Sequence, residues 1–268
     1  QIWLTPMITA DLEDFKNRNL NHRLLKGGLP PFFLSESISG ADYQEWIDAF
    51  WAKDIQELFR LERRDAFQKF MELLMIQSGG IFEATSFAGP CQASRQTITN
   101  YLRVLEATFI VNVLHPYYTN KKKEIVAAPK VYAFDTGFVC YFRGWDTLRT
   151  EDMGILWEHY VLNELNAILQ TRTIYYWRDK QKREIDFVIV GRKGTVTAIE
   201  CKWSVESFDP SALLAFRREH TNGRNFVVCN NVDRSFERRY EGITVTIVNI
   251  QTLIRNISAT SSISSPFL

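Results

Sequence analysis

Apolar side chains at helical spacing mark the first regular part of the chain. Those that fit one helical face over residues 41–62 are Tyr43, Trp46, Ile47, Phe50, Ile55, Leu58 and Phe59. A second run of this kind, from Phe67 to Ile76, predicts another helix, which ends at a Ser-Gly-Gly break. Residues 1–34 show no such period, so we expect them to be irregular.

The following stretch predicts short helices and strands in a recognisable order. Residues 81–88 and 94–105 are expected to be helices separated by Gly89-Pro90, and residues 109–114 and 130–135 to be strands joined by a basic loop. Helix, helix, strand, basic loop and strand is the order of a winged helix, whose second helix reads DNA. The predicted nucleic-acid-binding residues are Arg95, Gln96, Thr97, Asn100 and Arg103 on that helix, and Lys121, Lys122 and Lys123 in the loop. Winged helices also mediate protein contacts, so a protein partner stays open.

The C-terminal half predicts a second fold. A long amphipathic helix is expected over residues 152–169, and a later one over residues 211–219. The expected strands cover residues 173–177, 183–190, 195–202, 225–229 and 243–248. The third strand, the later helix and the fourth strand form a right-handed βαβ crossover. The predicted class is therefore α+β and α/β, with an N-terminal helical and winged-helix region before a restriction-endonuclease-like αβββαβ domain.

Two adjacent strands of this half carry a specific chemical pattern. Asp186 lies in one strand, and Glu200 and Lys202 lie two residues apart in the next, so that Glu200 and Lys202 share one face. Mg²⁺ is usually held by one or two carboxylates together with water and substrate phosphate. A neighbouring lysine can stabilise charge that develops on a scissile phosphate. We therefore predict Asp186, Glu200 and Lys202 as catalytic residues around Mg²⁺ or Mn²⁺. The alternative is a set of solvated charges on a half-exposed hairpin.

The register of this hairpin decides whether the two carboxylates meet. If Val190 paired with Thr195 across a four-residue loop, Asp186 would lie opposite Ile199 and on the other face from Glu200. A loop with an odd number of residues, or a β-bulge, would bring both carboxylates to one face. We predict one or the other.

Composition limits the remaining possibilities. The 268 residues include 46% hydrophobic ones, and the net charge is only +1, so any surface for nucleic acid must be local. Four cysteines lie far apart without zinc spacing, which favours free thiols in a reducing, cytoplasmic setting. No apolar run approaches a membrane span, and we expect no membrane partner.

Several motifs in order resemble one prokaryotic family. These are Lys26-Gly27-Gly28-Leu29-Pro30, Asn100–Glu106, Pro129–Gly137, Leu156-Trp157-Glu158, Tyr175–Arg178, Glu184–Phe187 and Ile199–Lys202. Together they are similar to the C-terminal two-thirds of AAA-type ATPases that carry domain of unknown function 4143. The family's terminal domain is similar to the PD-(D/E)xK nucleases.

The resemblance implies further roles and partners. Glu158 would be an acidic helix residue at the metal, Asp186 and Glu200 the other carboxylate ligands, and Cys201 a ligand through its backbone carbonyl. The expected divisions are an ATPase remnant and linker helix (1–60), a winged-helix domain (61–148), a nuclease-like domain (149–256) and a flexible tail (257–268). The resemblance also implies an ATP-binding region upstream of Gln1. This sequence contains no phosphate-binding loop, so we expect no ATP hydrolysis by this chain itself. DNA, the protein's own ATPase domain and a second copy are the expected partners.

Fold does not fix function, so two interpretations remain. One is Mg²⁺-dependent DNA hydrolysis. The other is an inactive nuclease-like fold that serves nucleic-acid binding, partner binding or assembly.

Overall fold

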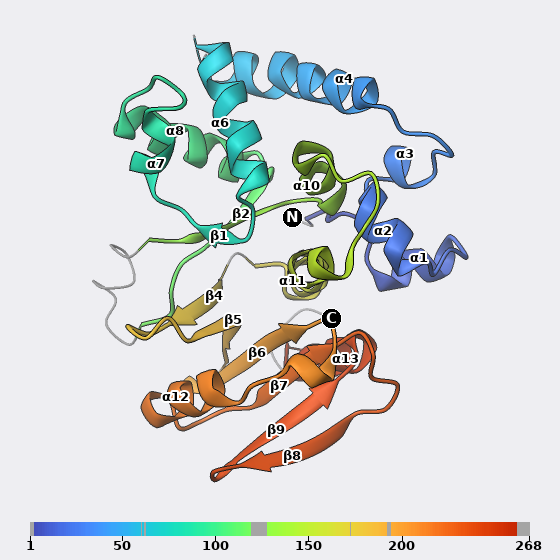
Figure 1. The fold of residues 1–268 in the computed structure, drawn as a ribbon, viewed down its shortest axis with the longest axis vertical. Helices are drawn as coiled ribbons and strands as arrows, with labels where there is room; N and C mark the ends of the chain where they lie inside the picture. The colour runs from blue at the N-terminus through green and yellow to red at the C-terminus, as the bar shows by residue number, and fades with distance from the viewer. Residues whose placement is uncertain are drawn as a thin grey trace, which may run out of the picture. The chain divides into compact units, whose positions relative to one another are not determined.

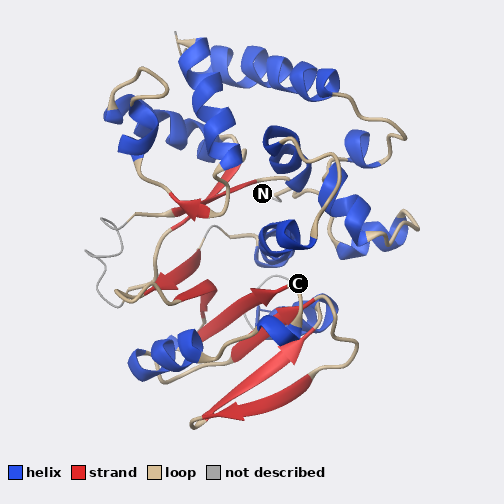
Figure 2. Cartoon of the chain, in the orientation of Figure 1, coloured by secondary structure: helices blue, strands red, loops and turns tan. Residues whose placement is uncertain are grey.

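The chain divides into two compact units. The computed structural model describes residues 3–59, 61, 63–118, 128–171, 173–191 and 194–261. One unit combines residues 1–9, 114–127 and 149–268, and the other combines residues 10–113 and 128–148. The predicted class is confirmed, because a helical region precedes a mixed α/β domain with a six-stranded sheet (Figure 1, Figure 2).

Helices dominate the unit formed by residues 10–113 and 128–148. Its first helices are α1 (Thr9–Asp14), α2 (Leu20–Lys26), α3 (Pro30–Phe33), α4 (Gly40–Phe50), the π-helix η1 (Trp51–Gln56) and α5 (Glu57–Phe59). The prediction that residues 1–34 are irregular is wrong, because α1, α2 and α3 form there. Each of these helices is too short to show a repeating apolar period, and short helices depend on tertiary packing. The contacts of α2 with α10 (Thr136–Arg143) provide such packing.

The predicted order of two helices followed by two strands is confirmed for residues 84–133, and the basic loop lies outside the described residues. From residue 64 to residue 133 the elements are α6 (Arg64–Ile76), β1 (Gly80–Ile81), α7 (Ala84–Ala88), α8 (Arg95–Ala107), β2 (Val111–Leu114) and β3 (Lys130–Ala133). The small sheet has the order β1-β3-β2, so β3 lies between the other two strands. Ser94 caps α8, since its hydroxyl accepts a hydrogen bond from the Thr97 N–H at 3.1 Å. The buried side of α8 includes Ile98, Tyr101 and Leu105.

A buried carboxylate joins the start of α10 to the end of α2. Asp135 caps α10 by accepting the Gly137 N–H at 2.8 Å, and its second oxygen accepts the Gly28 N–H at 2.6 Å. Burial raises the pKa of Asp135, and the Arg23 charge and the backbone donors partly offset this rise. Gly27 adopts a φ of +86°, and a Cβ there would lie 2.0 Å from an oxygen of Asp135. Only glycine fits this position without displacing the cap.

Gly27→Ala should destabilise this helical unit by about 1–3 kcal/mol, because the substitution combines a strained φ with a clash against the buried carboxylate. Urea unfolding followed by circular dichroism measures the change. Gly89→Ala is the matched control, since a Cβ at Gly89 meets nothing within 4 Å. An equal loss of stability in both variants would contradict the cap's importance.

The unit that contains the C-terminal half is built on a six-stranded sheet. Its strands are β4 (Ile174–Arg178), β5 (Glu184–Val190), β6 (Val196–Lys202), β7 (Asn225–Cys229), β8 (Phe236–Tyr240) and β9 (Ile243–Val248), in the order β4-β5-β6-β7-β9-β8. Its helices are α11 (Thr150–Leu169), the 3₁₀ turn η3 (Val205–Ser207), α12 (Ser211–Glu219) and α13 (Ile250–Ser261). The β4–β5 and β5–β6 pairs are antiparallel, whereas the β6–β7 and β7–β9 pairs are parallel.

The predicted αβββαβ core is confirmed, with additions after it. The segment from α11 to β7 supplies the core, and α12 crosses from β6 to the parallel strand β7 (Figure 1). Ala198 of β6, Leu213 and Phe216 of α12 and Val227 of β7 belong to one buried apolar cluster. The edge strand β8 and helix α13 were not predicted, and α13 extends into the segment predicted as a flexible tail.

Candidate metal and phosphodiester site

The hairpin register puts Asp186 of β5 directly opposite Glu200 of β6. Val190 pairs with Val196 and Phe187 with Ile199, so residues 191–195 form a five-residue connection. The next pair in this register is Asp186 with Glu200. The predicted odd-numbered loop is therefore confirmed. The register between β4 and β5 also shifts, so that β5 places one extra residue between Ile185 and Val188.

Asp186 is tied to the backbone of the neighbouring strand. Its side chain is buried, and one carboxylate oxygen (Oδ2) accepts the Cys201 N–H at 2.7 Å. The N–H and C=O of one strand residue point to the same neighbour in an antiparallel pair, so the Cys201 carbonyl is also directed toward the β5 side. The role of the Cys201 carbonyl as a metal ligand stays a prediction. The Cys201 side chain is buried and, within the part of the chain that the structure describes, takes part in no disulfide.

Glu200 is a buried acid with one unsatisfied oxygen. Its side chain is only 3% exposed, and among the described residues its Oε1 has no hydrogen-bond partner. Its other oxygen, Oε2, lies 3.4 Å from Lys202 Nζ. Burial raises the pKa of Glu200 to about 8, the Lys202 charge lowers it in part, and the Asp186 charge adds to the rise. A cation at Oε1 would compensate this buried charge.

Lys202 ends β6 within a cluster of carboxylates. Burial alone lowers the pKa of Lys202, but attraction from Asp186, Glu200 and Glu158 raises it overall. Lys202 therefore stays positively charged at neutral pH. The helix acid Glu158, on α11, is half-buried, and its charge acts on Lys202. The four residues singled out from the sequence thus belong to one electrostatic neighbourhood.

The donor set fits a magnesium ion that keeps part of its water shell. Among the described residues, no three His, Cys, Asp or Glu side chains gather into a metal-binding group. Mg²⁺ needs only one or two carboxylates, and Asp186 and Glu200 can provide them. The unsatisfied Glu200 Oε1 supports this fit. Direct ligation by Glu158 stays a prediction.

Glu200→Gln should stabilise the metal-free protein by about 1–3 kcal/mol at pH above 8, because it removes a buried charge. Since the folded-state pKa of about 8 exceeds the ordinary value of 4.5, the folded state binds more protons between these pH values. The free energy of unfolding should therefore fall as pH rises from about 4.5 to 8 in the wild type, and less so in the variant. Urea titrations in EDTA at several pH values test this. Glu237→Gln, on exposed β8, is the control and should leave the slope unchanged.

The predicted nucleic-acid-binding residues differ in exposure, and some of them lie outside the described residues. Arg95, Gln96, Asn100 and Arg103 are exposed on α8, whereas Thr97 is half-buried and bonded to Ser94. Lys121, Lys122 and Lys123 lie outside the described residues. The exposed face of α8 leaves the DNA-reading role open to test.

Sequence reasoning missed two features of the sheet domain. A pocket formed by the β4–β5 turn and α12 carries Lys180 and Arg218. Arg217, also on α12, is 6% exposed and holds the crossover to β7. Arg217 and Arg218 are adjacent in sequence, and only the helical phase of Phe216 and Leu213 could have indicated which of the two faces inward.

These features define a class of protein with an N-terminal helical region followed in sequence by a mixed α/β domain that has a six-stranded sheet. The family model DUF8612, a domain of unknown function, matches residues 17–149, and DUF4143, another domain of unknown function, matches residues 153–253. The chain therefore carries a DUF4143 domain, as predicted, and a DUF8612 domain, which was not predicted.

Two mycobacterial proteins are homologous to the chain. The uncharacterized protein Rv2008c of Mycobacterium tuberculosis and the uncharacterized protein Mb2031c of Mycobacterium bovis are each 30% identical to it over 171 residues. The match covers 62% of this chain and 39% of each relative. Among the described residues, no helix is long and apolar enough to span a membrane.

Proposed function

We propose that the DUF4143 domain hydrolyses DNA phosphodiester bonds with Mg²⁺ at Asp186, Glu200 and Lys202. The observation that carries the proposal is the buried Glu200 Oε1, which has no hydrogen-bond partner among the described residues. A buried carboxylate of this kind is costly unless a cation compensates it. The register aligns Asp186 on the neighbouring strand with Glu200, which supports a cation shared by the two carboxylates.

Each residue has a distinct role in this proposal. Asp186 and Glu200 hold the ion, with the Cys201 carbonyl as a further oxygen ligand and Glu158 as an additional acid. The bound ion would lower the pKa of water and stabilise charge on the phosphate. Lys202, kept positively charged by Asp186 and Glu200, stabilises the additional negative charge of the transition state.

The remainder of the chain suggests how DNA is presented. We propose that the exposed face of α8 binds DNA through Arg95, Asn100 and Arg103. We further propose that the intact protein couples this domain to an AAA-type ATPase. The relatives leave room for such a region, since the match covers only 39% of their length.

The decisive experiment combines a nuclease assay with metal calorimetry. Wild-type protein is incubated with labelled single-stranded and double-stranded DNA in Mg²⁺, in Mn²⁺ and in EDTA. Cleavage is expected only with metal, together with a saturable heat of metal binding. Asp186→Asn should remove both, because it removes a ligand charge while keeping the side chain's shape. Asp233→Asn is the control, since Asp233 is exposed on a loop before β8.

A second function would explain a negative result. If neither wild type nor control binds metal or cleaves DNA, the nuclease proposal fails. The exposed polar face of α8 then favours an inactive nuclease-like fold that serves nucleic-acid binding. A gel-shift measurement of Arg95→Ala and Arg103→Ala would test that function by itself.

A further inference from the structure

A pocket of about 590 Å³ opens between the β4–β5 turn and α12. All of its lining residues belong to the unit that contains the sheet. The turn leads directly into β5, whose third residue is Asp186. The pocket therefore includes the turn that precedes the strand of Asp186. Its volume is in the range of small-ligand sites.

The pocket has an excess of positive charge. Four cations line it, Arg178, Lys180, Arg183 and Arg218, and two carboxylates, Asp179 and Glu219, leaving an excess of two positive charges. Within the part of the chain that the structure describes, neither Lys180 nor Arg218 has an ion-pair partner, and both side chains are exposed at the rim.

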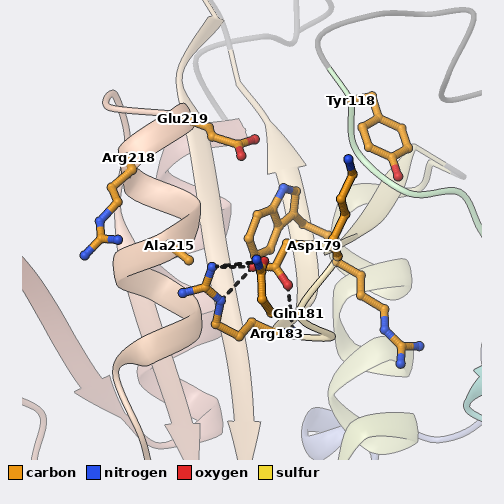
Figure 3. A pocket seen from close by; sticks show the side chains of 10 residues that line it. Tyr118, Asp179, Gln181, Arg183, Ala215, Arg218 and Glu219 are labelled. Carbon is orange, nitrogen blue, oxygen red and sulfur yellow. Dashed lines mark hydrogen bonds and ion pairs between the residues drawn. The ribbon is translucent and has the colours of Figure 1, made fainter.

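The turn that presents Lys180 is held firmly. Arg183 donates through Nε to Asp179 Oδ2 at 2.6 Å, and the backbone N–H groups of Arg183 and Lys182 also bond to Asp179. The negative charge of Asp179 is thus compensated by Arg183 within the turn, and the dashed lines in Figure 3 mark this contact. Arg178 has its own partner, since Nη1 lies 3.7 Å from Glu184 Oε2. Lys180 and Arg218 are thus the cations that remain available to a ligand.

Aromatic surface completes the pocket. Tyr118 is half-buried and lies across the pocket from α12, which carries Arg218 (Figure 3). Trp177 is 3% exposed and packs edge-on against Phe216 at a ring-centroid distance of 5.4 Å, so it forms a rigid wall. Cations beside an accessible aromatic ring are the combination that binds phosphates and unpaired bases.

We propose that this pocket binds a single strand of nucleic acid, with its phosphates at Lys180 and Arg218 and an unpaired base against Tyr118. The inference rests on the proposed hydrolysis and deepens it by naming the strand type that the domain holds. A duplex keeps its bases paired and stacked, so it cannot offer one to Tyr118. A free phosphate would use the cations but leave the ring without a partner.

Binding without catalysis tests the proposal. Fluorescence anisotropy measures a labelled oligothymidylate of about twelve nucleotides in EDTA, a length suited to such platforms. The Lys180→Ala/Arg218→Ala variant should weaken binding about 10-fold or more and reduce the salt dependence by about one to one and a half ions. The matched control is Arg234→Ala/Arg239→Ala, which removes two exposed charges near the opposite sheet edge, at β8, and should bind like the wild type.

The tyrosine and competitors separate a strand from other ligands. Tyr118→Leu should weaken binding of the oligothymidylate about 5- to 100-fold but leave an abasic oligomer of the same length unaffected. Duplex, thymidine monophosphate or inorganic phosphate that competes as well as the single strand would overturn the strand assignment. Equal loss in the pocket variant and the control variant would overturn the site.

The two proposals fail in distinguishable ways. If DNA is cleaved in an Asp186-dependent manner while the pocket variants bind normally, the pocket inference is wrong and the hydrolysis stands. If the pocket variants lose the strand while no metal-dependent cleavage occurs, the binding site stands and the hydrolysis is wrong. Thermal unfolding of each variant confirms that the exposed substitutions leave the fold intact.

Discussion

Lys202→Met should lower the turnover number for DNA cleavage by about 10²- to 10³-fold, the cost of removing one preorganised charge that stabilises a transition state. Metal binding should survive, because Asp186 and Glu200 supply the ligand oxygens. KM for DNA should change little, since the charge acts mainly on the transition state. Steady-state kinetics on labelled DNA, with calorimetry of the metal alone, measure these quantities separately.

Lys202→Arg serves as the conservative comparison. It keeps a charge near Glu200 Oε2, which lies 3.4 Å from Lys202 Nζ, and should retain part of the activity. Equal loss of turnover in the arginine and methionine variants would indicate a requirement for exact placement. Loss of metal binding in Lys202→Met would contradict the assigned role, because Lys202 would then organise the ligands instead of the transition state.

The alignment of Asp186 with Glu200 could be predicted in part, because strand alternation is a local rule and the length of the connection then decides the register. Glu200 and Lys202 must share a face of β6, and an odd-numbered connection or a β-bulge is needed to put Asp186 on the same face as Glu200. The observed pairing of Val190 with Val196 meets that condition. The burial of Glu200 and its unsatisfied oxygen could not be read from the sequence, because they depend on the elements that cover the end of β6.

The elements that escaped prediction do so for different physical reasons. The strand β8 (Phe236–Tyr240) is largely exposed and rich in charge, so it lacks the apolar alternation by which strands are recognised. Helices α1 to α3 are too short to show a period. Helix α13 did carry a signal, since Ile250, Leu253, Ile254 and Ile257 recur at helical spacing. The segment that follows is rich in serine and threonine, a composition that predicts a flexible tail.

Arg217→Met should cost about 3–5 kcal/mol of stability and is expected to be the most damaging single substitution in the sheet domain. The Arg217 guanidinium is buried and donates five hydrogen bonds. Their acceptors are Asn225 Oδ1 (2.5 Å), His220 O (2.9 Å), Asn222 O (3.2 Å), Val196 O (2.8 Å) and Arg224 O (2.7 Å). Burial lowers the pKa of Arg217 to about 10, so the charge persists at neutral pH. Methionine fills similar space but leaves buried carbonyls without donors.

The five hydrogen bonds of Arg217 fix the path of the chain between α12 and β7. Apolar contacts are not directional and could not fix that path as closely. Gly223 lies in this connection with a φ of +137°, and a Cβ there would lie 1.9 Å from the Val196 carbonyl oxygen.

Arg217→Lys should lose most of the same stability, because one ammonium cannot reach acceptors spread around a planar guanidinium. The neighbouring Arg218→Met is the control and should change stability by less than about 0.5 kcal/mol, since Arg218 is exposed. Urea unfolding followed by tryptophan fluorescence measures all three. Equal midpoints for Arg217→Met and Arg218→Met would show that the hydrogen bonds contribute no net stability, and that the crossover is held by the apolar contacts of Leu213 and Phe216 instead.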